Sequence, residues 1–175
     1  MALVELLSKE REAILKRWHE RVIETYPAET AGFLAQRSEP FANPVGATLS
    51  KELPVVYQAL LGAADPTRTA QSLDDLVRLR AVQNFSPSQA IGFIFTLKSV
   101  IRELLGDALS APELIEEWPG VEARIDSLAL SAFDAYAANR ERMCEIRINA
   151  MRKRTYILER VALGLHSEDQ GDPGP

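Results

Sequence analysis

Cysteine and histidine are scarce in this sequence of 175 residues, which has one cysteine, Cys144, and two histidines, His19 and His166. A single cysteine cannot form an intramolecular disulfide, and metal sites draw on several such side chains at short spacings. Neither histidine has a second histidine or cysteine at such a spacing, so we interpret His19, next to Trp18, as structural or solvated. We therefore expect no metal and no cofactor.

Long apolar runs and catalytic motifs are also lacking. The sequence has no stretch of about 18 apolar residues and no charged segment leading into an apolar one, so we expect no stable membrane insertion and a cytoplasmic location. No glycine-rich phosphate loop follows a strand, and no serine or cysteine nucleophile stands in a known motif. The adjacent acids Asp74-Asp75 and Glu116-Glu117 would point to different sides of a helix. We therefore expect a protein that is not an enzyme.

Basic residues are in the minority, with a net charge of -5 and a pI near 5.2. A general nucleic-acid binder needs a dominant basic surface, so we exclude that role. The share of hydrophobic residues, 46%, is large enough for one compact domain with a sizeable core. We expect a single domain over residues 1–165 and a disordered, acidic, proline-containing tail over residues 166–175.

The clearest element that the sequence contains is a helix from Pro87 to Leu105. Ser86 suits the N-cap, Pro87 suits the first helical position, and Gln89 completes a capping box. Apolar residues at spacings of three and four cover most of its circumference, so we expect the other helices to pack around it. These residues are Ala90, Ile91, Phe93, Ile94, Phe95, Leu97, Val100, Ile101, Leu104 and Leu105.

The remaining face of this helix carries the small residues Gly92, Thr96 and Ser99. Small side chains favour close approach of another helix or plain solvent exposure. They are also compatible with a groove for a small apolar ligand in the helical core. The sequence leaves these alternatives open.

Four further helices are predicted by apolar periodicity and by proline or glycine at their ends. They cover residues 3–26, residues 44–61 with Pro54 inside, a third helix closed by Asn84 and carrying Leu73, Leu76, Val77, Arg80 and Ala81, and a short helix starting at Pro112. Loops are predicted between them. They cover residues 28–42, with one turn of helix at most, and residues 65–67 and 107–111.

Residues 121–165 lack proline and predict one long C-terminal helix. Its first half has a wide apolar face suited to a domain core, which includes Phe133 and Tyr136. In its second half, apolar and small residues recur at the strict four-three spacing of a coiled coil, so we expect a homodimer or a partner helix. This seam consists of Cys144, Ile148, Met151, Thr155, Leu158, Ala162 and Leu165.

The flanks of the seam are rich in arginine and lysine, including the run Arg152-Lys153-Arg154. Such a run is compatible with anionic lipid, nucleic acid or an acidic partner. Glu141, Glu145 and Glu159 interleave with the basic residues, however, and this pattern favours the flank of a coiled coil.

Several blocks of the sequence resemble one family. They are Phe41-Ala-Asn-Pro-Val-Gly46, Arg80-Ala-Val-Gln-Asn-Phe-Ser-Pro-Ser-Gln-Ala90, Ile125-Asp126, Ala132-Phe-Asp-Ala-Tyr136, Arg140-Glu141 and Glu145-Ile-Arg147. From about residue 3 to residue 160 the sequence is similar to the N-terminal domain family of the RsbT co-antagonist RsbRD. In stressosome proteins such a domain precedes a STAS domain and passes a signal down a C-terminal linker helix.

The resemblance implies a helical sensory domain. The related RsbR sensor domains are globin-like dimers without haem, so a globin-like helical bundle is implied as well. This sequence carries no STAS domain after the linker helix, so we expect a stand-alone regulatory domain of a signalling pathway, in stress response, that dimerises and binds a protein partner through its last helix. The alternative is a carrier or sensor of a small apolar ligand beside Gly92, Thr96 and Ser99.

Overall fold

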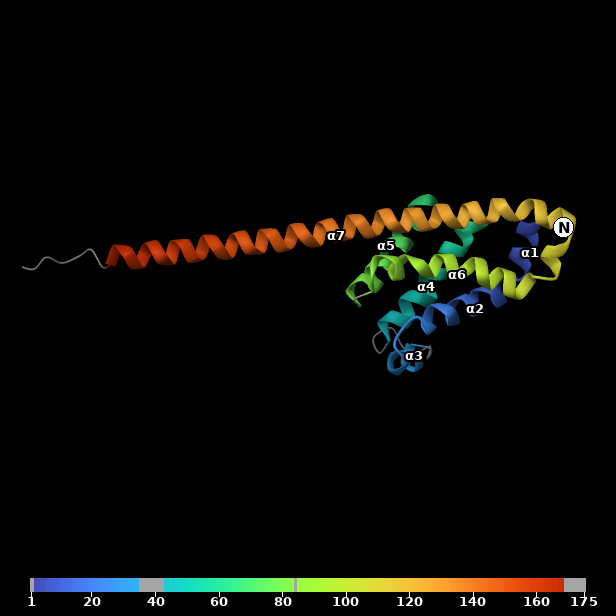
Figure 1. Ribbon diagram of the computed structural model, residues 1–175, viewed down its shortest axis with the longest axis horizontal. Helices are drawn as coiled ribbons and strands as arrows, with labels where there is room; N and C mark the ends of the chain where they lie inside the picture. The colour runs from blue at the N-terminus through green and yellow to red at the C-terminus, as the bar shows by residue number, and fades with distance from the viewer. Residues whose placement is uncertain (1, 35–42, 84, 169–175) are drawn as a thin grey trace, which may run out of the picture. The chain divides into compact units, whose positions relative to one another are not determined.

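The computed structural model describes residues 2–34, 43–83 and 85–168, and every regular element in these ranges is helical (Figure 1). The predicted all-α class with a long C-terminal helix is confirmed. The elements are α1 (Leu3–Lys9), α2 (Arg11–Glu24), α3 (Ala28–Leu34), α4 (Pro44–Leu60), α5 (Pro66–Val82), α6 (Pro87–Leu105), the 3-10 helix η1 (Ala108–Ser110) and α7 (Pro112–Glu168).

The contacts within the chain divide it into two units, Met1–Tyr136 and Ala137–Pro175. The boundary lies inside α7. The first unit contains the hydrophobic core, and all of the buried apolar side chains of the described residues belong to it. Each unit is therefore described by itself.

The central helix of the first unit is α6, as predicted. The Ser86 hydroxyl accepts a hydrogen bond from the Gln89 backbone N–H (3.3 Å), and the Gln89 side-chain oxygen accepts one from the Ser86 N–H (2.9 Å), which confirms the capping box. Eight apolar residues of α6 are buried. Phe95 and Leu104 are exceptions at 46% and 41% exposed, so the prediction that they join the apolar packing is wrong.

Helix α2 packs along α6 through an aromatic contact and an ion-pair cluster. The Trp18 indole N–H donates to the backbone oxygen of Phe93 (2.8 Å), and the two rings stack with their centroids 6.2 Å apart. Arg17 and Arg21 of α2 both bind Glu103 of α6, at 2.9 and 3.0 Å. The buried contact and the surface cluster together fix the register of the two helices.

The single helix predicted over residues 3–26 is wrong, because the chain forms two helices that meet at Glu10. Residues 9–12 are all charged, so no apolar contact supports that turn. The break lets Leu3 and Leu7 before it, and Ile14 after it, all reach the core. The loop predicted over residues 28–42 begins with α3, a helix of seven residues, and residues 35–42 lie outside the described ranges.

Two further boundaries differ from the predictions. The predicted turn at residues 65–67 is the start of α5, because the Asp65 carboxylate accepts a hydrogen bond from the Arg68 N–H (2.8 Å) and caps the helix. The short helix predicted from Pro112 is the first part of α7, which continues through Pro119. Leu114 and Val121 are buried on either side of Pro119, and this packing holds the helix together where one backbone donor is missing.

The part of α7 that belongs to the first unit packs as predicted along most of its length. Val121, Ile125, Ala129 and Ala132 are buried, whereas Phe133 is 52% exposed, so its predicted core position is wrong. Helix α7 extends to Glu168, three residues beyond the predicted end. The rest of the predicted tail, residues 169–175, lies outside the described ranges, as does Asn84, the predicted end of the third helix.

Candidate functional site

The predicted ligand groove on α6 lies on an open face of that helix. Gly92 and Thr96 are half-buried, and Ser99 is exposed. The Thr96 hydroxyl donates to the backbone oxygen of Phe93 (2.6 Å), so it is already used within α6. A methyl group added at Gly92 would meet no neighbouring atom within 4 Å, so no helix makes a close approach there. A ligand site at these residues stays a prediction.

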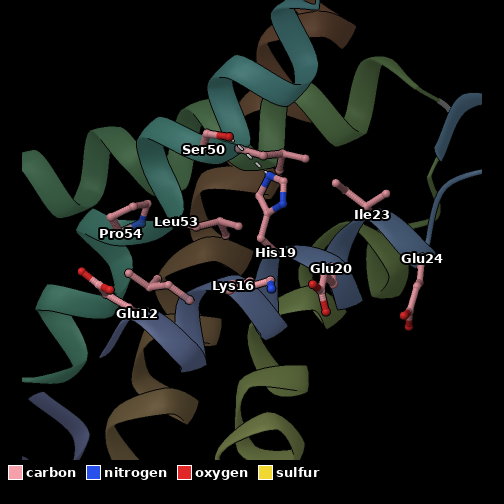
Figure 2. A pocket seen from close by; sticks show the side chains of 11 residues that line it. Glu12, Lys16, His19, Glu20, Ile23, Glu24, Ser50, Leu53 and Pro54 are labelled. Atoms are coloured by element: carbon pink, nitrogen blue, oxygen red, sulfur yellow. Dashed lines mark hydrogen bonds between the residues drawn. The ribbon is translucent and has the colours of Figure 1, made fainter. Parts of the chain in front are cut away.

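A concave surface does lie elsewhere, between α2 and α4. This α2–α4 groove has a volume of about 940 Å³ and is open to solvent. Figure 2 shows His19 in its middle, with the ring Nε2 3.4 Å from the Ser50 hydroxyl. Ile23 and Leu53 are buried in its floor, and acidic side chains such as Glu12 line its edge.

The side chains of the α2–α4 groove are mixed in character. Among the described residues, no group of three or more His, Cys, Asp or Glu side chains is placed to hold a metal ion. His19 contacts a serine hydroxyl, and its surroundings are a mixture of apolar floor and charged edge. The groove therefore offers a surface for binding, and its residues do not identify an occupant.

Glu52 forms a buried polar cluster between α4 and α5. Its side chain is 1% exposed, and its Oε2 accepts hydrogen bonds from Arg68 Nη2 (2.6 Å) and from the Ser72 hydroxyl (2.8 Å). Burial raises the pKa of Glu52, but the hydrogen bonds from Ser72 and Arg68 outweigh burial, so the pKa lies below its ordinary value. The buried carboxylate is charged and paired, and it has a structural role.

Arg80, on α5, is buried without such a carboxylate. Its side chain is 1% exposed, and Nη2 donates to the Thr25 hydroxyl and to the backbone oxygen of Gln89, both at 3.0 Å. Three aromatic rings surround its guanidinium carbon, and together with Arg80 and Thr25 they make up what we name the Arg80 cluster. The ring centroids lie 4.2 Å (Phe85), 5.3 Å (Tyr26) and 5.4 Å (Phe93) from Cζ.

The polar groups of the Arg80 cluster are only partly satisfied. Within the described residues, Nε and Nη1 of Arg80 and the buried hydroxyl of Tyr26 make no hydrogen bond of good geometry. The two side chains lie close enough only for a weak hydrogen bond to each other. The ion pairs formed by the described residues do not include Arg80. Burial lowers the pKa of Arg80 and raises the pKa of Tyr26, and the interaction between the two groups opposes both shifts.

The aromatic rings offset part of the cost of burying this charge. Burying an ion costs several kcal/mol even after relaxation, and arginine cannot lose its proton in a protein. Each cation–π contact is worth about 0.5 to 2 kcal/mol. One feature of the sequence indicates this cluster, because Arg80 stands in register with the apolar residues Leu73, Leu76 and Val77 of α5. A charged residue on a buried face needs partners, and the rings that supply them come from outside α5, with Tyr26 after α2, Phe85 before α6 and Phe93 within α6.

The second unit carries the predicted seam on a single helix. Every described side chain from residue 140 to residue 161 is exposed. On the seam, Ile148 is 47%, Met151 63% and Leu158 60% exposed, and Cys144 is exposed as a free thiol. Leu165 lies in α7, but its side chain is outside the described set. The described seam residues therefore present apolar surface at heptad spacing.

The sequence matches the family model described as the RsbT co-antagonist protein rsbRD N-terminal domain over residues 12–151. The chain belongs to this rsbRD N-terminal domain family. The resemblance is confirmed, although the match is shorter at both ends than the range of residues 3–160 that we expected. It covers the Arg80 cluster, the α2–α4 groove and the first part of the seam.

No curated protein and no solved structure matches the chain. The rsbRD N-terminal domain assignment therefore rests on the family model, and a globin-like arrangement stays a prediction. No helix in the described part of this family member is long and apolar enough to cross a membrane.

Proposed function

We propose that this rsbRD N-terminal domain is a non-enzymatic sensory and regulatory domain that works as a homodimer and binds a protein partner through its C-terminal helix. Membership of a family of stressosome-type sensory domains supports a regulatory role for this protein. The observation that carries the proposal is the seam, with Ile148, Met151 and Leu158 all about half exposed in the second unit. Most of the stability of helices in proteins comes from packing an apolar face, so a helix of this kind is expected to have a partner surface.

The residue types on the seam favour a pair of helices. With Ile148 at position a of a heptad, Met151 and Leu158 fall at position d, and isoleucine at a with leucine at d is the pattern of two-stranded parallel coiled coils. Thr155 falls at a second a position, where a polar group fixes register at a cost in stability. The dimer is therefore expected to have one defined alignment.

The charged flanks favour parallel over antiparallel pairing. Arg140, Arg147 and Arg154 occupy successive g positions. In an antiparallel pair g faces g, so arginines would oppose one another, whereas in a parallel pair each g residue faces the e residue five positions later in the partner. Arg140 and Arg154 would then face Glu145 and Glu159, and only Arg147 would face a like charge at Arg152. We infer a parallel dimer.

The energies predict a weak dimer. Burying one large apolar side chain fully is worth roughly 1.5 to 3 kcal/mol, and Ile148, Met151 and Leu158 have only about half of their surface left to bury, so the two copies together gain roughly 4.5 to 9 kcal/mol. Association costs at least about 4 kcal/mol of lost freedom. The remaining balance of at most about 5 kcal/mol corresponds to a dissociation constant of about 0.2 mM or weaker, which leaves room for exchange with a partner helix.

Cys144 provides a direct test of this alignment. It falls at a d position, where the side chains of a parallel dimer face each other across the axis, and the sequence has no other cysteine. Mild oxidation of the purified chain should therefore join two thiols from two copies into one disulfide. The covalent dimer is measured on a non-reducing gel, with Cys144→Ser as the control that should stay monomeric on the gel.

An antiparallel pair would place the two Cys144 residues far apart, toward opposite ends of the seam. Oxidation is therefore carried out at a protein concentration where light scattering shows the dimer. A yield of covalent dimer no higher than that of a denatured sample would contradict the parallel alignment. A chain that is monomeric in solution before oxidation would contradict the proposed dimer itself.

A further inference from the structure

The Arg80 cluster has unused donors that come from two separate segments of the chain. Arg80 on α5 contributes the Nε and Nη1 groups, and Tyr26, after α2, contributes its hydroxyl. The two residues are close enough that each shifts the pKa of the other. The donors of Arg80 and Tyr26 are matched by an acceptor that carries negative charge.

We propose that the Arg80 cluster is a binding site for a small oxyanion, a carboxylate or phosphate group, whose oxygens accept hydrogen bonds from Arg80 and from the Tyr26 hydroxyl. The guanidinium is buried, so the ligand would neutralise it in a low-dielectric site where charge-assisted hydrogen bonds are strong. The Nη2 group stays on Thr25 and Gln89 and keeps the guanidinium oriented.

Access to this site is expected beside Phe85. Its ring lies closest to the guanidinium carbon, at 4.2 Å, and Phe85 is half-buried whereas Tyr26 and Phe93 are buried. Phe85 also contacts Tyr26 edge to face, with centroids 5.0 Å apart. A rotation of the Phe85 side chain would uncover the guanidinium and leave the buried rings in place. The ligand is therefore expected to be small, with little bulk beyond its anionic group.

The test is binding of defined anions to the full chain. Sodium phosphate, sodium acetate and sodium benzoate are titrated at constant ionic strength held with sodium chloride, and the melting temperature Tm and the NMR signal of the Arg80 Nε–H group are followed. At least one probe should raise Tm with saturation and shift the Arg80 signal over the same concentration range. The probe that does so distinguishes a phosphate site from a carboxylate site.

Three variants assign the binding to this cluster. Tyr26→Phe keeps the ring and removes the hydroxyl, so it should weaken binding about three- to tenfold, the worth of one hydrogen bond. Arg80→Met should abolish saturable binding. Arg78→Met removes an exposed arginine of the same helix, paired with Asp75, and should bind like the unmodified chain. If Arg80→Met does not fold, the anion affinity of Tyr26→Phe and the shift of the Arg80 Nε–H signal decide whether the anion binds at this cluster.

The proposal is overturned if no probe gives a saturating response, or if Tyr26→Phe and Arg78→Met alter binding equally. This inference does not depend on the proposed dimer. A variant that disrupts the seam should keep the same anion affinity, so failure of one proposal is distinguishable from failure of the other.

Discussion

At the scale of single residues, two charged side chains of the first unit are buried, and they differ in the groups that surround their charge. Glu52 has an arginine and a serine as partners, whereas Arg80 has rings, one hydroxyl and one backbone oxygen. Both residues stand in helical register with apolar neighbours in the sequence, so their burial could be predicted from periodicity. Their partners could not, because Arg68 is 16 residues from Glu52, and Phe93 belongs to another helix than Arg80.

Replacing Glu52 with Gln should lower the free energy of unfolding by about 1 to 3 kcal/mol at pH 7, because the charge-assisted hydrogen bonds are lost. Burial raises the pKa of Glu52, but hydrogen bonds from Ser72 and Arg68 hold it below the ordinary value of 4.5. The carboxylate therefore stabilises the fold above pH 4.5, and this contribution is lost as the pH falls through the lower folded-state pKa.

Urea unfolding of the unmodified chain and of Glu52→Gln, measured at several pH values from 7 down to about 3, checks this expectation. The difference in unfolding free energy between the two should shrink at the acid end, where both side chains are neutral. A difference that is the same at every pH would mean that the charge of Glu52 contributes nothing to stability.

At the scale of helices, the residues that cap a helix predict where it begins better than the apolar periodicity does. Asn43-Pro44, Asp65-Pro66 and Ser86-Pro87 all consist of a capping side chain followed by proline, and all three open a helix. The second of these pairs coincides with the turn predicted at residues 65–67. The start of α5 could therefore be predicted from its cap alone. The break at Glu10 and the passage of α7 through Pro119 depend on contacts with other helices, which the sequence does not display.

Alanine substitutions at two helical glycines, Gly92 of α6 and Gly46 of α4, test whether the small-residue face of α6 is open. Gly92→Ala should raise the free energy of unfolding by about 0.5 to 1 kcal/mol, because alanine favours the helix and its methyl group meets no neighbour within 4 Å. Gly46→Ala should destabilise the protein, because its methyl group would collide with the Asn43 side chain that caps α4. Chemical denaturation of both variants measures the sign of the change in the free energy of unfolding. A destabilised Gly92→Ala would show that another surface packs closely on that face of α6.

At the scale of the whole molecule, the two units differ in how their apolar residues are used. The first unit buries its large side chains in one core, whereas the described side chains from residue 140 to residue 161 of the second unit are all exposed. Sequence periodicity predicted this difference, since the wide apolar face of the long helix narrows to a heptad seam. Whether the seam meets a second copy depends on an intermolecular contact, which periodicity does not determine.

The double substitution Ile148→Glu with Leu158→Glu should therefore convert the dimer into a monomer, because it places four carboxylates per dimer at the a and d positions of the seam. The chain offers a matched control in Ile146→Glu with Ile157→Glu. These residues are 57% and 59% exposed, similar to the seam residues, but they fall at the outer f and c positions of the same heptads. Light scattering over a range of concentrations measures the mass of each variant, and circular dichroism checks that the first unit stays folded.

The comparison between the two variants carries the conclusion. Loss of the dimer in the seam variant alone would identify the seam as the interface, because both variants gain the same charge and lose the same kind of apolar side chain. Equal loss in both would show that added negative charge, and no particular face of α7, disrupts association. A seam variant that stays dimeric with unchanged affinity would place the interface elsewhere, and the C-terminal helix would then lose its physical basis as the element that passes a signal to a partner.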